Sequence, residues 1–307
     1  MNKFIVTTTI NNPTLALKKY AKLKDWTLIV VGDLKTPEKK YQSLKNIIWL
    51  GTKDQLKLSK KLSNLIGWNC IQRRNFGFLL AFKLGAKIVA SVDDDNIPYD
   101  NWGKTIHLNK KNNINLYKSK ISSFDPLSIF NYPQKIWHRG YPLQLLQNPP
   151  KIKKLNSTLI PDIQANLWDM APDIDAMNRM SLKNEHYKFK VLKPYSSNKI
   201  MPFNSQNTIL SREAIKNYFM FPHIGRMDDI WAAFYVQSLG FKVIFDKPTV
   251  YQKRNEHNIY NDFLKELIGY KNNLSLINSL YKNPNNIKKF LPKESYEAFE
   301  EYKKLFV

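Results

Sequence analysis

Alternation between apolar runs and helical spacing constrains the fold of this 307-residue chain more than any other feature of its sequence. Four short apolar runs are typical of buried strands, and they occupy residues 4–10, 26–31, 46–50 and 87–92. Between them, residues 15–23 and 54–84 have the apolar spacing of helices. Strands that alternate with helices predict an α/β fold with a parallel, Rossmann-like sheet.

Acidic residues directly follow two of these strands. Gly32-Asp33 ends the second run, and Asp93, Asp94 and Asp95 end the fourth. In open parallel sheets, ligands bind beyond the carboxyl ends of the strands. Three adjacent carboxylates repel one another unless a cation or backbone donors neutralise them, and Mg²⁺ or Mn²⁺ takes oxygen ligands while leaving positions for substrate phosphates. An acidic turn is the alternative.

The charge balance points to an anionic partner. The chain has 48 Lys and Arg against 25 Asp and Glu, a formal net charge of +23. Nucleic acid, a phosphorylated ligand and an anionic membrane face all fit this charge. Because the lysines are dispersed and no recognition motif is present, nucleic acid is the least favoured partner.

Cysteine count and hydropathy bear on the compartment. Cys70 is the single cysteine, which excludes an internal disulfide or a thiolate metal cage. No apolar run approaches the ~18 residues of a membrane span, and the first residues lack a long apolar signal core. We therefore expect a cytoplasmic protein.

Two further clusters could carry chemistry. Arg73 and Arg74 open a predicted helix, where the dipole disfavours cations unless an anion lies there; a solvated basic turn is equally consistent. Asp228 and Asp229 lie in the first turn of a helix predicted over 227–239, where the dipole alone explains carboxylates. Successive helical residues point about 100° apart, so at most one should face a cleft, as a general base or by stabilising an oxocarbenium-like transition state.

Arg139 and His257 are the remaining candidates. Arg139 lies between aromatic residues in WHRGYP, where it could grip phosphate or carboxylate or simply stack. His257 lies in the polar run RNEHN, as a third metal ligand or a hydrogen-bonded loop residue.

The rest of the chain divides into three parts. Residues 113–172 are rich in Pro and aromatics with little periodicity, which predicts long loops wrapped on the sheet. Residues 207–210 and 241–245 have the pattern of strands, and the tail from 261 has helical spacing. We expect one domain over 1–258 and a helical extension over 259–307 packed on it.

Seven sequence blocks together resemble nucleotide-sugar glycosyltransferases of the GT-A fold. The resemblance is narrower to the group containing the reversibly glycosylated polypeptides (UDP-arabinopyranose mutases) and STELLO-type glycosyltransferase-like proteins, and it covers most of residues 4–265. The blocks are VGDLKTP (31–37), RRNFGF (73–78), DDDN (93–96), WHRGYPL (137–143), PFNSQNT (202–208), GRMDDIW (225–231) and RNEHN (254–258). It implies a mixed, mainly parallel sheet flanked by helices.

The resemblance also implies roles for individual residues. A Mn²⁺ or Mg²⁺ ion would be held by Asp93 and Asp95, with His257 near a C-terminal ligand position. The donor, a UDP-sugar or similar nucleotide-sugar, would contact Thr8, Asp33, Arg73, Arg74, Asp94 and Asn204. Asp33 would lie near the base or ribose, Arg74 near the diphosphate, and Asp228 or Asp229 near the sugar.

Arg139 falls where the mutases carry the arginine that becomes glycosylated. RNEHN and FNSQNT look more like the STELLO-type group, so we prefer Arg139 as a donor-binding or structural residue.

Three hypotheses follow. The first is a metal-dependent glycosyltransferase, a hexosyl- or pentosyltransferase acting on a glycan or lipid-linked acceptor, with its basic surface in peripheral contact with the inner membrane face. The second is a UDP-sugar mutase or self-glycosylating protein that uses Arg139. The third is a non-catalytic basic protein that binds nucleic acid or a membrane.

Overall fold

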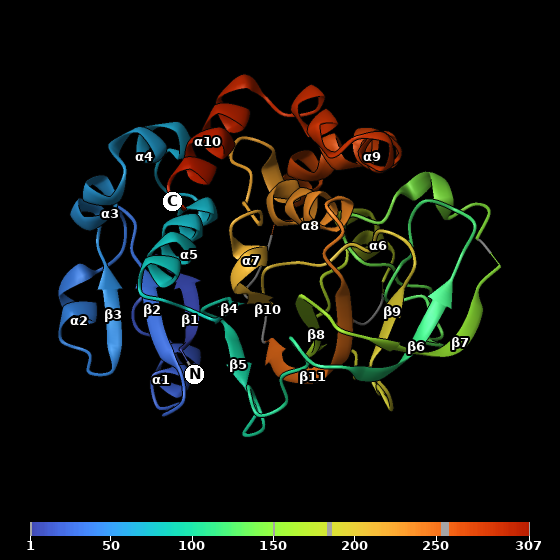
Figure 1. Ribbon diagram of the computed structural model, residues 1–307, viewed down its shortest axis with the longest axis horizontal. Coiled ribbons are helices and arrows are strands. Elements are labelled where there is room, and N and C mark those ends of the chain that lie inside the picture. Colours follow the sequence, from blue (N-terminus) through green and yellow to red (C-terminus); the bar gives the residue numbers. More distant parts are fainter. Residues whose placement is uncertain (1, 150, 183–185, 253–257, 307) are drawn as a thin grey trace.

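A single mixed sheet flanked by helices organises the molecule (Figure 1). The computed structural model describes residues 2–149, 151–182, 186–252 and 258–306. Within these ranges the sheet has eleven strands in the order β3-β2-β1-β4-β10-β8-β11-β9-β6-β7, and β5 pairs with β11. The predicted α/β class, with a mixed sheet between helices, is confirmed.

The N-terminal strands form the parallel part of the sheet. They are β1 (Lys3–Thr8), β2 (Thr27–Val31), β3 (Ile47–Leu50) and β4 (Ile88–Val92). All three pairings among them are parallel. Their carboxyl ends therefore meet at one edge, which brings together Thr8, Asp33 and Asp93.

Helices cover both faces of this parallel part. They are α1 (Leu15–Tyr20), α2 (Glu38–Gln42), α3 (Thr52–Leu58), α4 (Lys60–Ile66) and α5 (Arg74–Lys83). Side chains alternate across a strand, so Val6 joins the larger core beneath α5 while Ile5 joins a second core with Leu17 of α1. The region 54–84 was predicted as helical. The structure divides it into separate helices, with breaks at Ser59 and Gly67.

The predicted loop region over 113–172 is partly wrong, because it contains three strands of the sheet. The remaining strands are β5 (Asn96–Pro98), β6 (Asn112–Lys118), β7 (Lys153–Leu159), β8 (Ile163–Met170), β9 (Tyr195–Ser197), β10 (Asn207–Ser211) and β11 (Val243–Gln252). β7 buries no residue fully, and it is a strand because all seven of its residues pair with β6. Such pairing between distant segments leaves little apolar pattern in the sequence.

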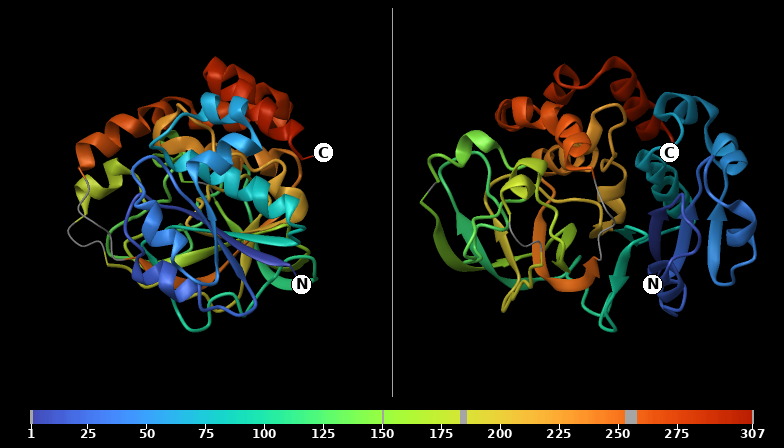
Figure 2. Two further views of the ribbon diagram at one scale, coloured as in Figure 1. Left: turned by 90° about the vertical axis from the view of Figure 1, so that its left-hand side faces the viewer. Right: turned by 180° about the vertical axis from the view of Figure 1, so that it is seen from behind.

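The C-terminal helices pack back over the sheet domain (Figure 2). The later helices are α6 (Ala176–Ser181), α7 (Arg212–Ile215), α8 (Asp228–Ser238), α9 (Ile259–Lys282) and α10 (Lys293–Lys304). The Tyr302 hydroxyl of α10 donates to the Ile215 carbonyl at 2.8 Å. No helix in the described ranges is long and apolar enough to cross a membrane.

Candidate functional site

Two adjoining cavities lie at the edge where the parallel strands end. The smaller, about 260 Å³, is lined by the ends of β1 and β4 and by Asp33. The larger, about 500 Å³, reaches the start of α8. Both are lined by Asn69, Cys70, Ile71, Asp93 and Asp95. Two residues of the acidic triplet, Asp93 and Asp95, therefore lie at the junction of the two cavities.

The three adjacent aspartates have different surroundings. Asp94 accepts hydrogen bonds from Thr9 Oγ1 at 2.5 Å and Asn11 Nδ2 at 3.1 Å. Burial raises the pKa of Asp94, and these two bonds act in the opposite direction. Asp95 accepts a bond from Gln252 Nε2 at 3.1 Å, and this glutamine ends β11. Asp94 thus ties β4 to the loop after β1, while Asp93 and Asp95 line both cavities.

Arg74 is the partner of Asp93. Its Nη2 lies 2.7 Å from Asp93 Oδ1, and its Nη1 donates to Ser91 Oγ and to Ser205 Oγ at 3.0 Å. Thr8 Oγ1 accepts a further bond at 3.4 Å. The anion that we expected near this cationic helix start is therefore a carboxylate of the chain itself. Arg74 and Thr8 both line the smaller cavity, and their contact with a donor stays a prediction.

The hypothesis that Arg73 contacts a donor is not supported by its position. Its side chain is 0% exposed and lines neither cavity. The guanidinium stacks on Trp68, 3.7 Å from the ring centroid, and donates to Gln55 and Ser63. Burial lowers the pKa of Arg73 to about 10. Adjacent helical residues point in different directions, so Arg73 faces the packing around α4 while Arg74 faces the cleft.

Asp33 fixes a loop of the cleft. Its Oδ1 accepts from the backbone amides of Leu34 at 2.7 Å and Asn69 at 2.9 Å, and its Oδ2 accepts from Cys70 at 3.0 Å. Both oxygens thus bond to the backbone. Asp33 lines the smaller cavity, where the base or ribose was predicted, and it holds residues 69 and 70 in the wall.

Asp228 and Asp229 both line the larger cavity, although we expected at most one to do so. Both residues lie in the first turn of α8, which directly follows a 3₁₀ turn over residues 225–227. Asp228 accepts from Gln72 Nε2 at 2.8 Å. Burial, together with the charge of Asp229, raises the pKa of Asp228 to about 7. Asp229 accepts from Ser205, whose amide lies at 2.9 Å.

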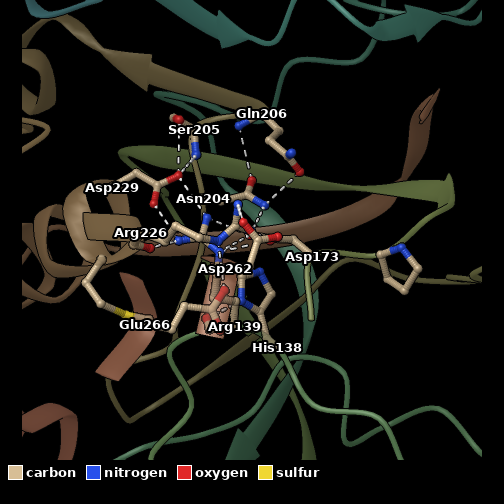
Figure 3. Close-up of polar contacts among 12 residues, drawn as sticks. His138, Arg139, Asp173, Asn204, Ser205, Gln206, Arg226, Asp229, Asp262 and Glu266 are labelled. Carbon is tan, nitrogen blue, oxygen red and sulfur yellow. Dashed lines mark hydrogen bonds and ion pairs between the residues drawn. The ribbon is translucent and has the colours of Figure 1, made fainter. Parts of the chain in front are cut away.

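Arg139 is held between two carboxylates (Figure 3). Its Nη2 lies 2.8 Å from Asp173 Oδ2, and its Nη1 lies 3.1 Å from Asp229 Oδ1. Burial acts to lower the pKa of Arg139, but the two carboxylates outweigh it and raise the pKa well above its usual value. A guanidinium that stays protonated is a poor nucleophile, and this geometry favours the structural or binding role that we preferred for Arg139.

Sequence reasoning missed Asp173, which joins the two sides of the site. It bonds Arg139 and accepts from Asn204 Nδ2 at 2.8 Å. Asn204, predicted to bind donor, lines neither cavity and instead orients Asp173. Asp173 stands in PDID, where alternating carboxylates were the only signal in the sequence.

Arg226 connects this group to the C-terminal helix. Its Nε lies 2.8 Å from Glu266 Oε1, and its Nη1 lies 3.3 Å from Asp262 Oδ1. Both acids belong to α9 and are buried. They are spaced i,i+4 on one face of α9, and this spacing is visible in the sequence. The predicted division at residue 258 stays a prediction, and α9 supplies side chains to the site.

The donor set for a metal consists of oxygens. Asp93 Oδ1 accepts a bond from Arg74, and Asp95 Oδ2 accepts one from Gln252. Among the described residues, no group of three or more His, Cys, Asp or Glu is arranged to hold a metal. His257, the predicted third ligand, lies outside the described residues. Two carboxylates fit Mg²⁺ or Mn²⁺, because these ions complete their coordination with water and substrate phosphates.

Comparison with known proteins gives two curated relatives and no matching family model. The chain is 23% identical over 273 residues to the "Probable glycosyltransferase STELLO2" of Arabidopsis thaliana, which covers 81% of this chain and 35% of that protein. It is 32% identical over 92 residues to "Probable glycosyltransferase STELLO1" of the same plant, covering 30% of this chain and 12% of that protein. The chain thus spans about a third of the length of STELLO2.

Among solved structures, one similar fold is a mannosyltransferase of Pyrobaculum calidifontis, PcManGT, in complex with GDP-Man and Mn²⁺. It is 9% identical, with a TM-score of 0.39, and the match covers 99% of this chain and 85% of that one. This likeness is too distant to bear on the chemistry of the site. The sequence similarity confirms the predicted resemblance to the STELLO-type group: this chain is similar to the STELLO-type probable glycosyltransferases.

Proposed function

We propose that this chain is a metal-dependent glycosyltransferase that moves a sugar from a nucleoside-diphosphate donor, a UDP-sugar, to a hydroxyl of a glycan or lipid-linked acceptor. One observation carries the proposal. Asp93 and Asp95 stand where the two cavities meet, and Asp228 and Asp229 lie in the larger one. A donor whose diphosphate lies at this junction would extend its nucleoside into one cavity and its sugar into the other.

The smaller cavity suits a nucleoside. Ile10 and Ile71 offer apolar surface for a base, and Thr9 and Asn69 offer polar atoms for its edge and the ribose. Asp33 contributes indirectly, because both its oxygens hold the wall over residues 69 and 70. Some apolar surface beside fixed polar groups is what a small-molecule site needs to hold and orient its ligand.

Asp93 and Asp95 would hold Mn²⁺ or Mg²⁺ together with diphosphate oxygens. When bound, such an ion acts as a Lewis acid that stabilises the charge on the departing diphosphate. Arg74 contributes in two ways: it fixes the orientation of Asp93, and it places a second positive charge at the junction.

Asp228 is our candidate general base. Its pKa of about 7 means that the carboxylate is both present and basic near neutral pH, as proton abstraction from an acceptor hydroxyl requires. Asp229 has a different task, because Arg139 and Ser205 hold it in place. We assign to Asp229 the stabilisation of positive charge that develops on the sugar, and to Arg139 the positioning of Asp229.

Isothermal titration with UDP tests the metal-dependent donor site. We expect UDP to bind more tightly with Mn²⁺ than without it, and Asp95→Ala to abolish this difference. Asp54→Ala, a change of a half-exposed aspartate on α3, is the matched control. Equal UDP affinity with and without Mn²⁺ would remove the central claim.

Incubation with a radiolabelled donor separates transfer from self-glycosylation. Our proposal expects label on an added acceptor or in free sugar, and none on the protein. Protein-bound label that disappears in Arg139→Lys would instead support the mutase hypothesis.

A further inference from the structure

Large apolar side chains are exposed on two neighbouring helices beside the cleft. On α9, Tyr260, Leu264 and Leu267 are 64%, 45% and 44% exposed. On α6, Met177 and Met180 are 43% and 56% exposed. Their spacing of three and four residues places each set along one side of its helix. Such clusters on a protein surface mark sites of interaction with another molecule or with a membrane.

The two sets lie close together. The backbone amide of Ala176 donates to Glu266 Oε2 at 2.8 Å. Met177 and Leu267 are the next residues along the two helices. Figure 2 shows α6 and α9 side by side at the outer edge of the molecule in its left-hand view. We call these five exposed residues and their two helices the α6–α9 face.

The acidic and the basic residues of α9 differ in their exposure to solvent. Its only acids, Asp262 and Glu266, are buried and paired with Arg226. Lys265 and Lys271, by contrast, are exposed. The outward side of α9 from 260 to 271 therefore combines apolar residues with positive charge and has no exposed carboxylate, a pattern typical of helices that lie on anionic membranes.

We propose that the α6–α9 face docks on the surface of an anionic lipid bilayer. The apolar side chains enter the interface between headgroups and acyl chains, and Lys265 and Lys271 contact lipid phosphates. Lys265 also lines the larger cavity, so docking brings the mouth of that cavity to the membrane. The proposal does not rest on the diphosphate site, because none of its residues lines the junction of the two cavities.

An apolar cavity beside this face is consistent with a lipid surface. It has a volume of about 340 Å³ and is lined by Leu127, Phe130, Ile136, Leu145 and Leu146, among others. Asn178 of α6 donates to the carbonyl of Lys135 in its wall, and Gln144 donates to the carbonyl of Tyr270 in α9. The apolar character of the face thus continues into the neighbouring segment.

Vesicle co-sedimentation of the full chain tests the proposal. We expect binding to vesicles of phosphatidylcholine with about 30 mol% phosphatidylglycerol, and little binding to phosphatidylcholine alone. Raising the salt from about 0.1 M to about 0.5 M should weaken the binding only in part, because salt screens the lysines and leaves apolar insertion intact.

Two pairs of double variants localise the contact. Leu264→Gln with Leu267→Gln removes apolar surface from the face; Leu56→Gln with Leu84→Gln, at 38% and 44% exposure elsewhere, is its control. Lys265→Gln with Lys271→Gln removes charge from the face; Lys288→Gln with Lys289→Gln is its control. We expect the partition coefficient to fall about tenfold or more in each face variant and to stay within about twofold in each control.

Three outcomes would overturn the proposal. The wild type does not sediment with the anionic vesicles, or the face and control variants lose binding equally, which would indicate general attraction by net charge. The third is a dimer in analytical ultracentrifugation that Leu264→Gln with Leu267→Gln converts to monomer, because the face would then join two copies of the chain. Circular dichroism and thermal melting of each variant confirm that it is folded.

Discussion

Arg73 and Arg74 are neighbours with different environments. Arg73 stacks on Trp68 inside the packing of α4, whereas Arg74 bonds Asp93 at the junction of the cavities. The sequence shows only two adjacent arginines, and the direction of each side chain depends on where α5 begins. A rotation of about 100° around the helix axis, from one residue to the next, thus separates a packing residue from a site residue.

Paired substitutions distinguish these roles. Arg73→Lys keeps the charge but loses the planar stacking, so we expect a loss of about 1–3 kcal/mol in the free energy of unfolding and little change in UDP affinity. Arg74→Lys loses the branched set of bonds to Asp93, Ser91 and Ser205, so we expect UDP affinity with Mn²⁺ to fall about tenfold or more. Urea unfolding and calorimetric titration measure the two effects. Equal effects of the two variants on UDP affinity would contradict this assignment.

Asp228 gives a prediction about activity and pH. If it is the base, the transfer rate rises as pH increases through about 7, because only the ionised carboxylate accepts a proton. We expect Asp228→Asn to lower the rate by about 100-fold or more and to remove this rise. Initial rates measured from a pH of about 5 to a pH of about 9, a range that brackets this pKa, test the prediction. An unchanged pH profile in the variant would exclude Asp228 as the base.

The same carboxyl predicts the pH dependence of stability. The folded state keeps the proton up to a pH of about 7, while an unfolded aspartate loses it near a pH of about 4, so this group makes folding less favourable as pH rises between those values. Asp228→Asn should therefore be more stable than wild type at a pH of about 8, by about 1 kcal/mol or more, and similar to it at a pH of about 4. Thermal melts of both proteins measure this, with Asp54→Asn as a surface control.

At the scale of elements, the contact between α9 and the start of α8 shapes the site. Gly225 has φ +61°, and a Cβ there would lie 2.2 Å from the carbonyl oxygen of Lys265 in α9. The glycine therefore permits both the turn before Asp228 and the close approach of the helix that carries Glu266.

Two glycine variants separate these requirements. Gly240 also has a positive φ, +96°, but a Cβ there meets nothing within 4 Å. Gly225→Ala and Gly240→Ala share the cost of the left-handed conformation, about 1 kcal/mol, and only the first adds a clash with a backbone atom. We expect Gly225→Ala to be less stable than Gly240→Ala by about 1–3 kcal/mol in urea unfolding. Equal losses of stability in the two variants would show that α9 can move away from residue 225 at no cost in free energy.

Element prediction succeeded where apolar runs were long and failed where pairing was distant. β1, β2, β3 and β4 followed from their apolar runs, to within two residues at every end. β7 did not, because KKLNSTL has polar residues on both faces and gains its strand geometry from β6. The physical reason is that strand formation there depends on a partner about forty residues away.

At the scale of the whole molecule, the C-terminal extension closes the larger core. Leu276, Ile277, Leu280, Phe299 and Tyr302 are buried in that core. The extension also contributes Asp262 and Glu266, the partners of Arg226. Its helices therefore take part in both packing and the electrostatics of the site.

Truncation after residue 258 tests this. Removal of residues 259–307 would expose the core side chains that pack against these apolar residues. It would also leave Arg226 without its partners on α9. We expect the fragment to be insoluble or to bind the dye ANS as a loosely packed state, since burying such side chains contributes about 1.5–3 kcal/mol each. A soluble fragment with a cooperative melt like that of the full chain would contradict this view.

The sequence alone determined the α/β class, the strands that precede Asp33 and Asp93, the acidic residues of the cleft and the resemblance to STELLO-type proteins. These features are local, because they depend on apolar periodicity and on short blocks of neighbouring residues. Other features depend on the tertiary structure. Arg139 lies between Asp173 and Asp229. Arg73 stacks on Trp68 away from the cleft, and α9 reaches the site. Each of those contacts joins segments distant in the chain, and only the packed fold fixes how such segments meet.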